Sequence, residues 1–461
     1  MTRPTNIVLI LADDMGYGDL GVFGDGSSRT PALDVLAADG LCLTQHYSAS
    51  AVCAPARASL LTGRYPHRTG AIDTLEGRGL DRLALRERTL ADALGAAGYA
   101  TGLIGKWHLG ALDPRYHPNA RGFREFVGFR GGWSDYYQWR LDRNGRSFPA
   151  DGRYLTDVFT EEAVGFVRRH RDEPFFLHLA YNAPHFPLQC PEEDARPFRE
   201  AGFPPPLAAL YGMVARMDAG IGRVLDTLDE LGLRDDTLVL FTSDNGPQFS
   251  YEGESLVRFN AGFRGSKGAV FEGGIRVPAI VRWPAGLPAG RHVHEMMHFA
   301  DWLPTLLTVA GVTVPPALPA LPLDGESALP HLRGEGGGGQ SPRFWQWNRY
   351  TPLVTGNAAM RDGPWKLVRP AISEAMRVAP EDLAMDRRLK YEPDAFADIR
   401  RDPEPVRDVP PPPPPLLFHL RDDPGEERDL VAAEPARAGA MLRRLEDWFA
   451  AVEAERAAIA D

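Results

Sequence analysis

The sequence predicts an α/β fold: a large, mostly parallel sheet sandwiched by helices, with a smaller C-terminal unit of antiparallel sheet plus helix. Short apolar runs alternate with helix-forming segments along the first part of the chain. The last part has closely spaced strand-like segments and one long amphipathic helix. At 461 residues the chain is long enough for two structural units, which we place at residues 1–340 and 341–461.

The strands of the first unit are predicted from apolar runs that are continuous, as in strands buried on both faces. Between these runs lie segments whose apolar residues recur near the helical period. Such alternation is typical of a parallel sheet covered by helices. We predict strands within 6–12, 99–105, 174–184 and 237–243, and helices at 31–39, 89–97, 160–169 and 207–231.

The second unit follows a glycine-rich connection at 334–342. Beyond it, 344–350 has strand character, and 359–370 is predicted to form two strands joined by a turn at Asp362-Gly363. Residues 371–409 are charged and contain several prolines, so we expect an irregular excursion that leads into the proline run 410–415. We expect a last strand at 416–420 and a terminal helix at 435–457.

The bulk composition limits the classes of function. Lysine plus arginine number 51 and aspartate plus glutamate 62, so the net charge of −11 argues against general binding to nucleic acid or an anionic membrane. We expect a cytoplasmic protein without a membrane partner, because no apolar stretch has the length of a signal-peptide core or a transmembrane helix. Cys42, Cys53 and Cys190 give no disulfide framework. Cys53 is then either a small buried apolar residue or a chemical group.

Polar side chains follow two of the predicted strands directly. Asp13 and Asp14 end the first run, and Asp244 and Asn245 end the last. Ligands bind beyond the carboxyl ends of the strands in parallel sheets, so we expect these side chains to meet. Carboxylate and amide oxygens favour Ca²⁺ or Mg²⁺ over zinc. The alternative is structural, with an aspartate capping a helix and 243–246 forming a turn.

Basic residues form a second candidate group. On an acidic protein, several cations beside a divalent ion describe a pocket for an oxyanion. Each residue also has an ordinary structural interpretation, as a solvated loop lysine or a buried histidine with satisfied hydrogen bonds. The group comprises Arg57, Lys106, His108, His185 and Lys267.

The segment around Cys53 carries a resemblance to a known family. Cys53-Ala-Pro-Ala-Arg57, followed by ASLLTGRYPHRTG, resembles the signature of the type I sulfatases of the alkaline phosphatase superfamily. Further blocks occur in the family's order over nearly the whole chain, which makes the resemblance specific. They include LADDMGYGDLG at 11–21, GKWHLG at 105–110, NAPHFP at 182–187, SDNGP at 243–247 and GSKGAVFEGGIRVP at 265–278.

The resemblance implies an enzyme that hydrolyses sulfate monoesters. In the family the motif cysteine becomes Cα-formylglycine, whose hydrate attacks sulfur, so we expect a formylglycine-generating enzyme as a partner during maturation. The core Cys53-x-Pro55-x-Arg57 is intact, although Ala56 stands where the family most often has serine. The implied Ca²⁺ ligands, for which Mg²⁺ is the alternative ion, are Asp13, Asp14, Asp244, Asn245 and an oxygen of residue 53.

The resemblance also implies roles for the basic residues. Lys106, His185 and Lys267 hold the sulfate oxygens. His185, with Lys267, protonates the departing alcohol. His108 takes the proton from the second hydroxyl of the hydrate, which releases sulfate and restores the aldehyde. Arg57 orients residue 53.

The substrate is expected to be a small-molecule or saccharide sulfate ester. Some sulfatases place a substrate-contacting polar residue where this chain has Ser134. Aromatic residues either stack on a sugar or an aryl ring, or serve ordinary packing. The candidates are Trp133, Tyr136, Tyr137 and Trp139 in one cluster, and Trp345, Trp347 and Tyr350 in another.

Two other functions compete with the sulfatase hypothesis. A phosphonate monoester or phosphodiester hydrolase of the same superfamily would share the fold, the formylglycine and most metal ligands, because both esters present tetrahedral oxyanions. A non-catalytic, sulfatase-like binding protein would keep Cys53 unmodified, but every expected catalytic position is filled in this sequence.

Overall fold

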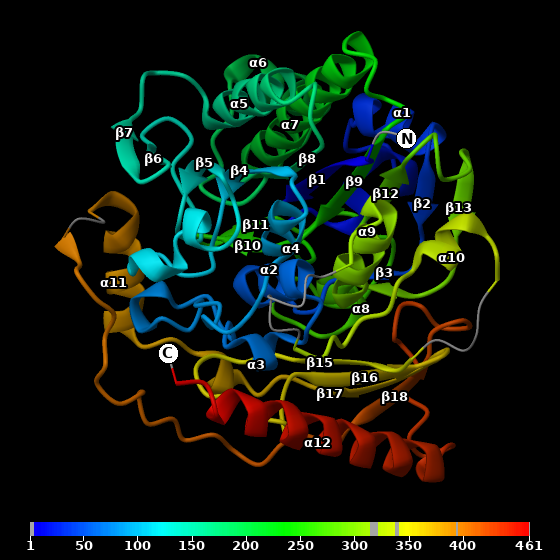
Figure 1. The fold of residues 1–461 in the computed structure, drawn as a ribbon. Helices are drawn as coiled ribbons and strands as arrows, with labels where there is room; N and C mark the ends of the chain where they lie inside the picture. Colours follow the sequence, from blue (N-terminus) through cyan, green and yellow to red (C-terminus); the bar gives the residue numbers. More distant parts are fainter. Residues whose placement is uncertain (1–3, 314–320, 337–340, 393–394, 461) are drawn as a thin grey trace.

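A computed structural model describes residues 4–313, 321–336, 341–392 and 395–460. A large sheet runs through the main body with helices on both sides, and a separate C-terminal sheet lies below it in Figure 1. This is the predicted architecture of a mostly parallel sheet sandwiched by helices plus an antiparallel C-terminal unit. The predicted boundary at residue 340 falls outside the described residues and stays a prediction.

The middle of the main sheet consists of the strands predicted from the apolar runs. Strand β1 pairs in parallel with β8 on one side and with β9 on the other, and β4 pairs in parallel with β8 and β5. The strand order is β13-β2-β12-β9-β1-β8-β4-β5-β6-β7. The bounds are β1 (Asn6–Ala12), β2 (Leu41–Leu43), β4 (Ala100–Lys106), β5 (Glu125–Phe129), β6 (Arg140–Arg143), β7 (Arg146–Pro149), β8 (Phe175–Ala180), β9 (Thr237–Ser243), β12 (Ala279–Arg282) and β13 (Arg291–Val293).

Both faces of this sheet are covered, which explains the continuous apolar runs. Alternate residues of a strand point to opposite faces. Val8 and Ile10 of β1 pack in one hydrophobic cluster with α5 and α7, whereas Ile7 and Leu9 pack in another with α2, α4 and α9. The helix bounds are α1 (Pro31–Ala38), α2 (Cys53–Thr62), α3 (Pro66–Thr69), α4 (Leu90–Ala96), α5 (Leu155–Arg169), α6 (Glu192–Glu200), α7 (Pro205–Glu230), α8 (Glu272–Ile275), α9 (Trp302–Ala310) and α10 (Leu329–Arg333).

The C-terminal sheet is antiparallel and has the order β15-β16-β17-β18. Met360, Leu367 and Leu417 on one face pack against the terminal helix α12. Val368 and Phe418 on the other face pack toward the main body. The bounds are β15 (Arg343–Gln346), β16 (Ala358–Asp362), β17 (Trp365–Arg369), β18 (Leu416–His419) and α12 (Pro435–Ala457), and two small sheets pair β3 (His46–Tyr47) with β14 (Met297–His298) and β10 (Ser250–Tyr251) with β11 (Glu254–Ser255).

The prediction of an irregular excursion at 371–409 is wrong for its middle part. Helix α11 (Pro380–Tyr391) occupies it and lies against the short 3₁₀ helix η3 (Glu76–Arg78) of the main body. The α11 sequence has no apolar stripe, because polar side chains bind this helix to the main body. Asp382 accepts hydrogen bonds from the Arg78 side chain at 2.9 Å. Tertiary ion pairs of this kind leave no apolar periodicity from which a helix could be predicted.

Within the described residues, no helix combines the length and the apolar composition that crossing a bilayer requires.

Candidate active site

The carboxyl ends of the central parallel strands bring the predicted site residues together. Asp13 and Asp14 follow β1, Lys106 ends β4, and Asp244 and Asn245 follow β9. His108 lies beyond β4 and His185 beyond β8. Neighbouring parallel strands end at the same edge of a sheet, so the topology alone places these groups beside one another.

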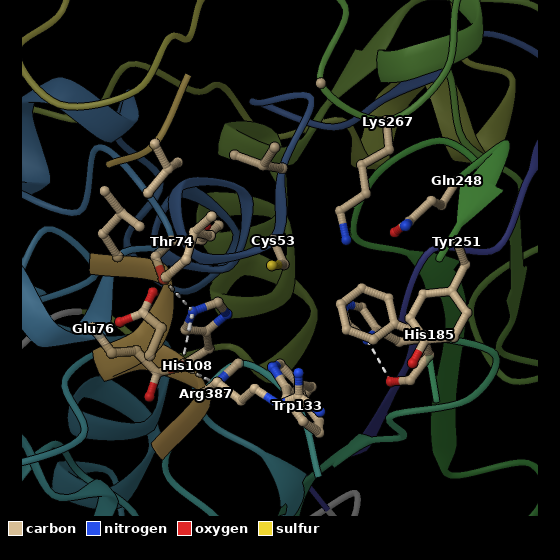
Figure 2. Close-up of a pocket in the computed structure, with 18 of the residues that line it drawn as sticks. Cys53, Thr74, Glu76, His108, Trp133, His185, Gln248, Tyr251, Lys267 and Arg387 are labelled. Carbon is tan, nitrogen blue, oxygen red and sulfur yellow. Dashed lines mark hydrogen bonds and ion pairs between the residues drawn. The ribbon is translucent and has the colours of Figure 1, made fainter. Parts of the chain in front are cut away.

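Cys53 is the first residue of α2 and lines a cavity of about 630 Å³. A cavity of this size suits a small organic ligand. Figure 2 shows Cys53 between His108 on one side and Lys267 and His185 on the other. The thiol is 2% exposed, and burial raises its pKa although Lys106 and Lys267 act in the opposite direction. An unmodified Cys53 is thus a protonated thiol at neutral pH, and a protonated thiol is a poor nucleophile.

Acidic oxygens beside Cys53 could hold a metal ion. The ligand atoms of Asp13, Asp244 and Cys53 all lie within 4.8 Å of one another. Among the residues that the structure describes, Oδ1 of Asp13 and Oδ1 of Asn245 are buried without a hydrogen-bond partner. Buried unsatisfied oxygens are costly, and a divalent cation satisfies several of them at once. These donors are hard oxygens and fit Ca²⁺ or Mg²⁺.

The electrostatics of these carboxyls are consistent with an ion between them. Burial and, next, the charge of Asp244 raise the pKa of Asp13 to about 8. A bound divalent cation reverses such a shift. Burial also acts to raise the pKa of Asp14, but Lys267 and His185 hold it below its usual range. The backbone of Asp14 is left-handed, with φ of 66°, a strained conformation for a residue other than glycine.

Arg57 is buried one turn into α2 and contacts Asp244. Its Nε and Nη2 donate to Oδ2 of Asp244 at 2.9 and 2.7 Å, and its Nη1 donates to the carbonyl of Lys106 at 3.2 Å. That Arg57 orients residue 53 stays a prediction; the hydrogen bonds described for its side chain go to the Asp244 carboxylate and to the end of β4. Arg57 therefore positions a candidate metal ligand.

Two lysines hold the first pair of carboxylates. Lys106 Nζ donates to Asp13 Oδ2 at 2.7 Å, and Lys267 Nζ donates to Asp14 Oδ2 at 2.7 Å. Lys106 is fully buried, whereas Lys267 lines the cavity. Burial lowers the pKa of Lys267, but Asp14 outweighs this effect and raises it. Both ammonium groups thus lie beside the candidate metal ligands.

His108 has one ring nitrogen engaged and one without a partner. Nε2 lies 3.4 Å from the carbonyl oxygen of Thr74 and 3.8 Å from Oε1 of Glu76, so this nitrogen carries the proton. Nδ1 is buried and has no hydrogen-bond partner in the described part of the chain. Burial, followed by the charge of Lys106, holds the pKa of His108 well below its usual value. The ring is therefore neutral, and its Nδ1 lone pair can accept a proton.

His185 lines the same cavity from the loop after β8. Its Nδ1 donates to the carbonyl of Phe186 at 2.8 Å, and its Nε2 lies 3.6 Å from Asp14 Oδ2. Burial and the charge of Lys267 hold the pKa of His185 well below its usual value. The Tyr136 hydroxyl donates to the carbonyls of Asn182 and His185 at 2.7 and 2.9 Å and so fixes this loop.

Comparison with known proteins identifies the family. The family model described as Sulfatase matches residues 5–312, and the one described as N-sulphoglucosamine sulphohydrolase, C-terminal, matches residues 264–376. The chain belongs to the sulfatase family. It is an enzyme that hydrolyses sulfate esters.

Relatives of this sulfatase resemble it over most of its length. Arylsulfatase A of Bos taurus is 34% identical, over 97% of this chain and 88% of the relative. N-acetylgalactosamine-6-sulfatase of Homo sapiens is 37% identical, over 72% of this chain and 66% of the relative. The crystal structure of Ps i-CgsB in complex with k-i-k-neocarrahexaose aligns with a TM-score of 0.79 and 30% identity, covering 97% of this chain and 93% of the other.

The predicted substrate contacts of the sulfatase lie in different places. Trp133 lines the cavity with Cys53. Ser134 lines a smaller neighbouring pocket of about 220 Å³. Tyr136 is fully buried beneath His185, so its predicted contact with substrate is corrected to a supporting role. Of the other aromatic candidates, Trp347 lines the cavity, whereas Trp139, Trp345 and Tyr350 are buried in packing.

Sequence reasoning missed one whole wall of the sulfatase's cavity. This wall combines the η3 turn, Arg349 from the C-terminal unit and the helix α11. Asp382, Asp386 and Lys390 recur every four residues and could have indicated a helical face. Their partners lie some 300 positions earlier in the chain, for example 304 for Asp382 and Arg78, so the contact itself leaves no local signal. The missed residues of this wall include Thr74, Glu76, Arg349, Leu383, Asp386, Arg387, Lys390 and Tyr391, and Gln248 and Tyr251 were missed elsewhere in the lining.

Proposed function

We propose that the protein hydrolyses a sulfate monoester with residue 53 as Cα-formylglycine and with Ca²⁺ bound by Asp13, Asp14, Asp244 and Asn245. The observation that carries the proposal is the position of Cys53. It lines the cavity at the first turn of α2, and its sulfur lies within 4.8 Å of the ligand atoms of Asp13 and Asp244. A side-chain oxygen on residue 53 would reach both the metal ion and a bound substrate from there.

A formylglycine at residue 53 and a divalent ion held by Asp13, Asp14, Asp244 and Asn245 would supply the nucleophile and its activation. The hydrated aldehyde would offer a hydroxyl to the ester, and the divalent ion would stabilise negative charge on oxygen. Oδ1 of Asp13 and Oδ1 of Asn245, which lack a hydrogen-bond partner among the described residues, support the ion's place. Binding of the oxyanion and transfer of protons are then the roles of side chains of this protein.

Lys106 and Lys267 bind the oxyanion of the ester. Both ammonium groups lie beside the candidate metal ligands, each 2.7 Å from a carboxylate oxygen. Fixed cations in a buried site stabilise charge that develops in the transition state more strongly than water does. Lys267 is the more exposed of the two, at 16% against 0%, and reaches the substrate from the cavity side.

His108 and His185 handle protons. His108 accepts a proton at Nδ1, the nitrogen to which no described group of the chain is hydrogen-bonded. His185, together with Lys267, donates a proton to the departing alcohol oxygen. A sulfate group beside His185 raises the pKa of the imidazole, which opposes the effect of burial in the free enzyme. Proton transfers of this kind each contribute on the order of 10²–10⁴-fold to the rate.

The proposed substrate is an aryl or carbohydrate sulfate. Relatives with 30% identity or more are named for aryl and for N-acetylgalactosamine 6-sulfates, and one was crystallised with a saccharide. Trp133 and Trp347 in the cavity lining offer faces for a flat ring or a sugar ring.

A side-by-side rate measurement tests the proposed function. The protein, matured with a formylglycine-generating enzyme and supplied with Ca²⁺, is given an aryl sulfate and the matching aryl phosphonate. We expect the higher kcat/KM for the sulfate. The Cys53→Ala variant should hydrolyse neither ester. A higher kcat/KM for the phosphonate would support the competing hydrolase instead.

A further inference from the structure

Helix α11 is anchored to the main body by one face. Asp382, Asp386 and Lys390 are spaced four residues apart and therefore lie on the same side of the helix. Asp382 pairs with Arg78, Asp386 accepts the backbone N–H of Gly77 at 2.9 Å, and Lys390 pairs with Glu76. The Tyr350 hydroxyl adds a hydrogen bond to Asp382 at 2.8 Å. These contacts fix how the helix is rotated about its axis.

The neighbouring face of α11 is directed to the cavity. Leu383, Arg387 and Tyr391 are again four residues apart, and all three line the cavity that holds Cys53. Leu383 and Tyr391 are large apolar side chains that remain 54% and 51% exposed. Apolar side chains left open around a cavity are typical of a ligand site.

Arg387 differs from the other cations of this wall, because they are neutralised by carboxylates. Arg349 pairs with Asp73 at 2.8 Å, and Lys390 pairs with Glu76. Arg387 is exposed, and within the described parts of the chain no carboxylate forms an ion pair with it. Figure 2 shows it beside Trp133, across the cavity from Lys267.

A row of aromatic rings connects α11 with the end of the cavity near His185, where the proposed function places the sulfate. The ring centroids of His185 and Phe186 are 4.1 Å apart, and those of Phe186 and Trp133 are 5.8 Å apart. The centroids of Trp133 and Tyr391 are also 5.8 Å apart. Aromatic faces pack well against the apolar faces of sugar rings. A ligand longer than one ring would therefore run from His185 toward Arg387.

We propose that Arg387 forms an outer anion subsite, so that the preferred substrate is a saccharide sulfate whose next ring carries a second anionic group. The guanidinium binds carboxylate and sulfate oxygens through paired N–H donors. The inference rests on the proposed function, since it takes the sulfate to be cleaved as lying beside Cys53. It adds the substrate class: a uronic acid carboxylate or a second sulfate one ring away.

Binding measurements on the Ca²⁺-loaded Cys53→Ala variant test the subsite without turnover. Calorimetry compares three sulfated disaccharides that are identical except at the second ring, which is neutral, carries a carboxylate, or carries a second sulfate. We expect one or both acidic forms to bind about 10-fold more tightly than the neutral form, the gain of one charge-assisted contact. Which form gains identifies the anion, and equal affinities for all three would overturn the proposal.

Arg387→Gln and Arg388→Gln, each made in the Cys53→Ala background, form a matched pair on the same helix. Arg388 is also exposed but pairs with Glu392 and lies outside the cavity lining. We expect the preference for acidic disaccharides to vanish in Arg387→Gln and to persist in Arg388→Gln. Loss of the preference in both variants, or in neither, would contradict the assignment, as would failure of all three disaccharides to bind. Hydrolysis of an aryl sulfate by the mature protein reports separately on the proposed function.

Discussion

Nη2 of Arg57 lies 2.7 Å from Oδ2 of Asp244, and both side chains are buried, with exposures of 1% and 0%. The same carboxylate uses its other oxygen, Oδ1, to accept the backbone N–H of Asp14 at 3.2 Å. One buried arginine thus holds a carboxylate that borders both Cys53 and the residues following β1. Partners of metal ligands orient the ligands and tune their affinity for the ion.

Arg57→Lys should weaken the binding of Ca²⁺. A lysine cannot reproduce the Nε and Nη2 contacts to Asp244, because it presents a single point charge. We expect the Kd for Ca²⁺ to rise about 10- to 100-fold, as is typical for the loss of such a partner. Titration of the metal-free protein by calorimetry measures this change, and saturating Ca²⁺ should restore part of the activity.

Arg216→Lys is the matched control for Arg57→Lys. Arg216 also contacts an aspartate through Nε and Nη2, at 2.8 and 2.6 Å, but its partner Asp157 belongs to α5. We expect its Kd for Ca²⁺ to remain unchanged. An unchanged Kd in Arg57→Lys as well would mean that Asp244 does not depend on Arg57 for its position.

Removal of the divalent ion should abolish hydrolysis and lower the melting temperature. Asp13 and Asn245 each have a buried oxygen without a hydrogen-bond partner among the described residues, and Asp13 and Asp244 repel each other when both are charged. Free Ca²⁺ at 100 times its Kd stabilises a folded protein by about 2.7 kcal/mol. Thermal unfolding and aryl sulfate turnover, each with chelator and after Ca²⁺ is restored, check this. A chelated protein with full activity would exclude Ca²⁺ from the reaction.

Gly132→Ala should reduce kcat without unfolding the protein. A Cβ atom at Gly132 would lie 2.6 Å from Cε1 and 2.8 Å from Nε2 of His108, so the imidazole would have to move. A displaced catalytic group costs on the order of 10²-fold in rate. Gly439→Ala in α12, where the added Cβ meets nothing closer than 3.6 Å, is the control and should keep full activity. Normal kcat in Gly132→Ala would show that His108 tolerates the shift.

The free energy of unfolding should depend on pH through Glu87. This side chain contacts Arg64, which lies just after the end of α2. Burial raises the pKa of Glu87 to about 7, although Arg64 Nε lies 3.1 Å from its Oε2. Because the folded pKa is above the unfolded value, this contribution is complete below pH 4.5 and is lost as the pH rises through about 7. As the pH rises through this window, the free energy of unfolding should therefore fall less in the Glu87→Gln variant than in the unsubstituted protein. The two losses should differ by roughly 1–3 kcal/mol. Urea unfolding at about pH 5 and about pH 7.5 measures the difference, and parallel losses in both proteins would contradict it.

Much of the fold and site could be predicted because local pattern and topology agree. Residues 7–12 of β1 are all apolar, since both faces of the strand are covered, and the residues that follow such a run lie at the carboxyl end of the sheet. Asp13 and Asp244 could be paired in this way before any geometry was known. Their separation of 231 positions in the chain does not matter once β1 and β9 are adjacent and parallel.

The remaining features depend on tertiary contacts that no local pattern encodes. Trp133 and Tyr136 are only three residues apart, yet one lines the cavity and the other lies beneath His185. Helix α11 is held by ion pairs with η3, so its apolar residues could remain exposed to the cavity and gave no amphipathic signal. The target of Arg57 was likewise set by the approach of α2 to the end of β9.

The central claim is that residue 53 is Cα-formylglycine in the active protein, and peptide mass spectrometry tests it most directly. The tryptic peptide Thr30–Arg57 of protein matured with a formylglycine-generating enzyme contains both Cys42 and Cys53. After thiol alkylation we expect one adduct, placed on Cys42 by fragment ions, and a residue 53 that has exchanged H₂S for O. Two adducts on the peptide from protein that hydrolyses sulfate esters would contradict the claim, because the active enzyme would then carry a cysteine thiol.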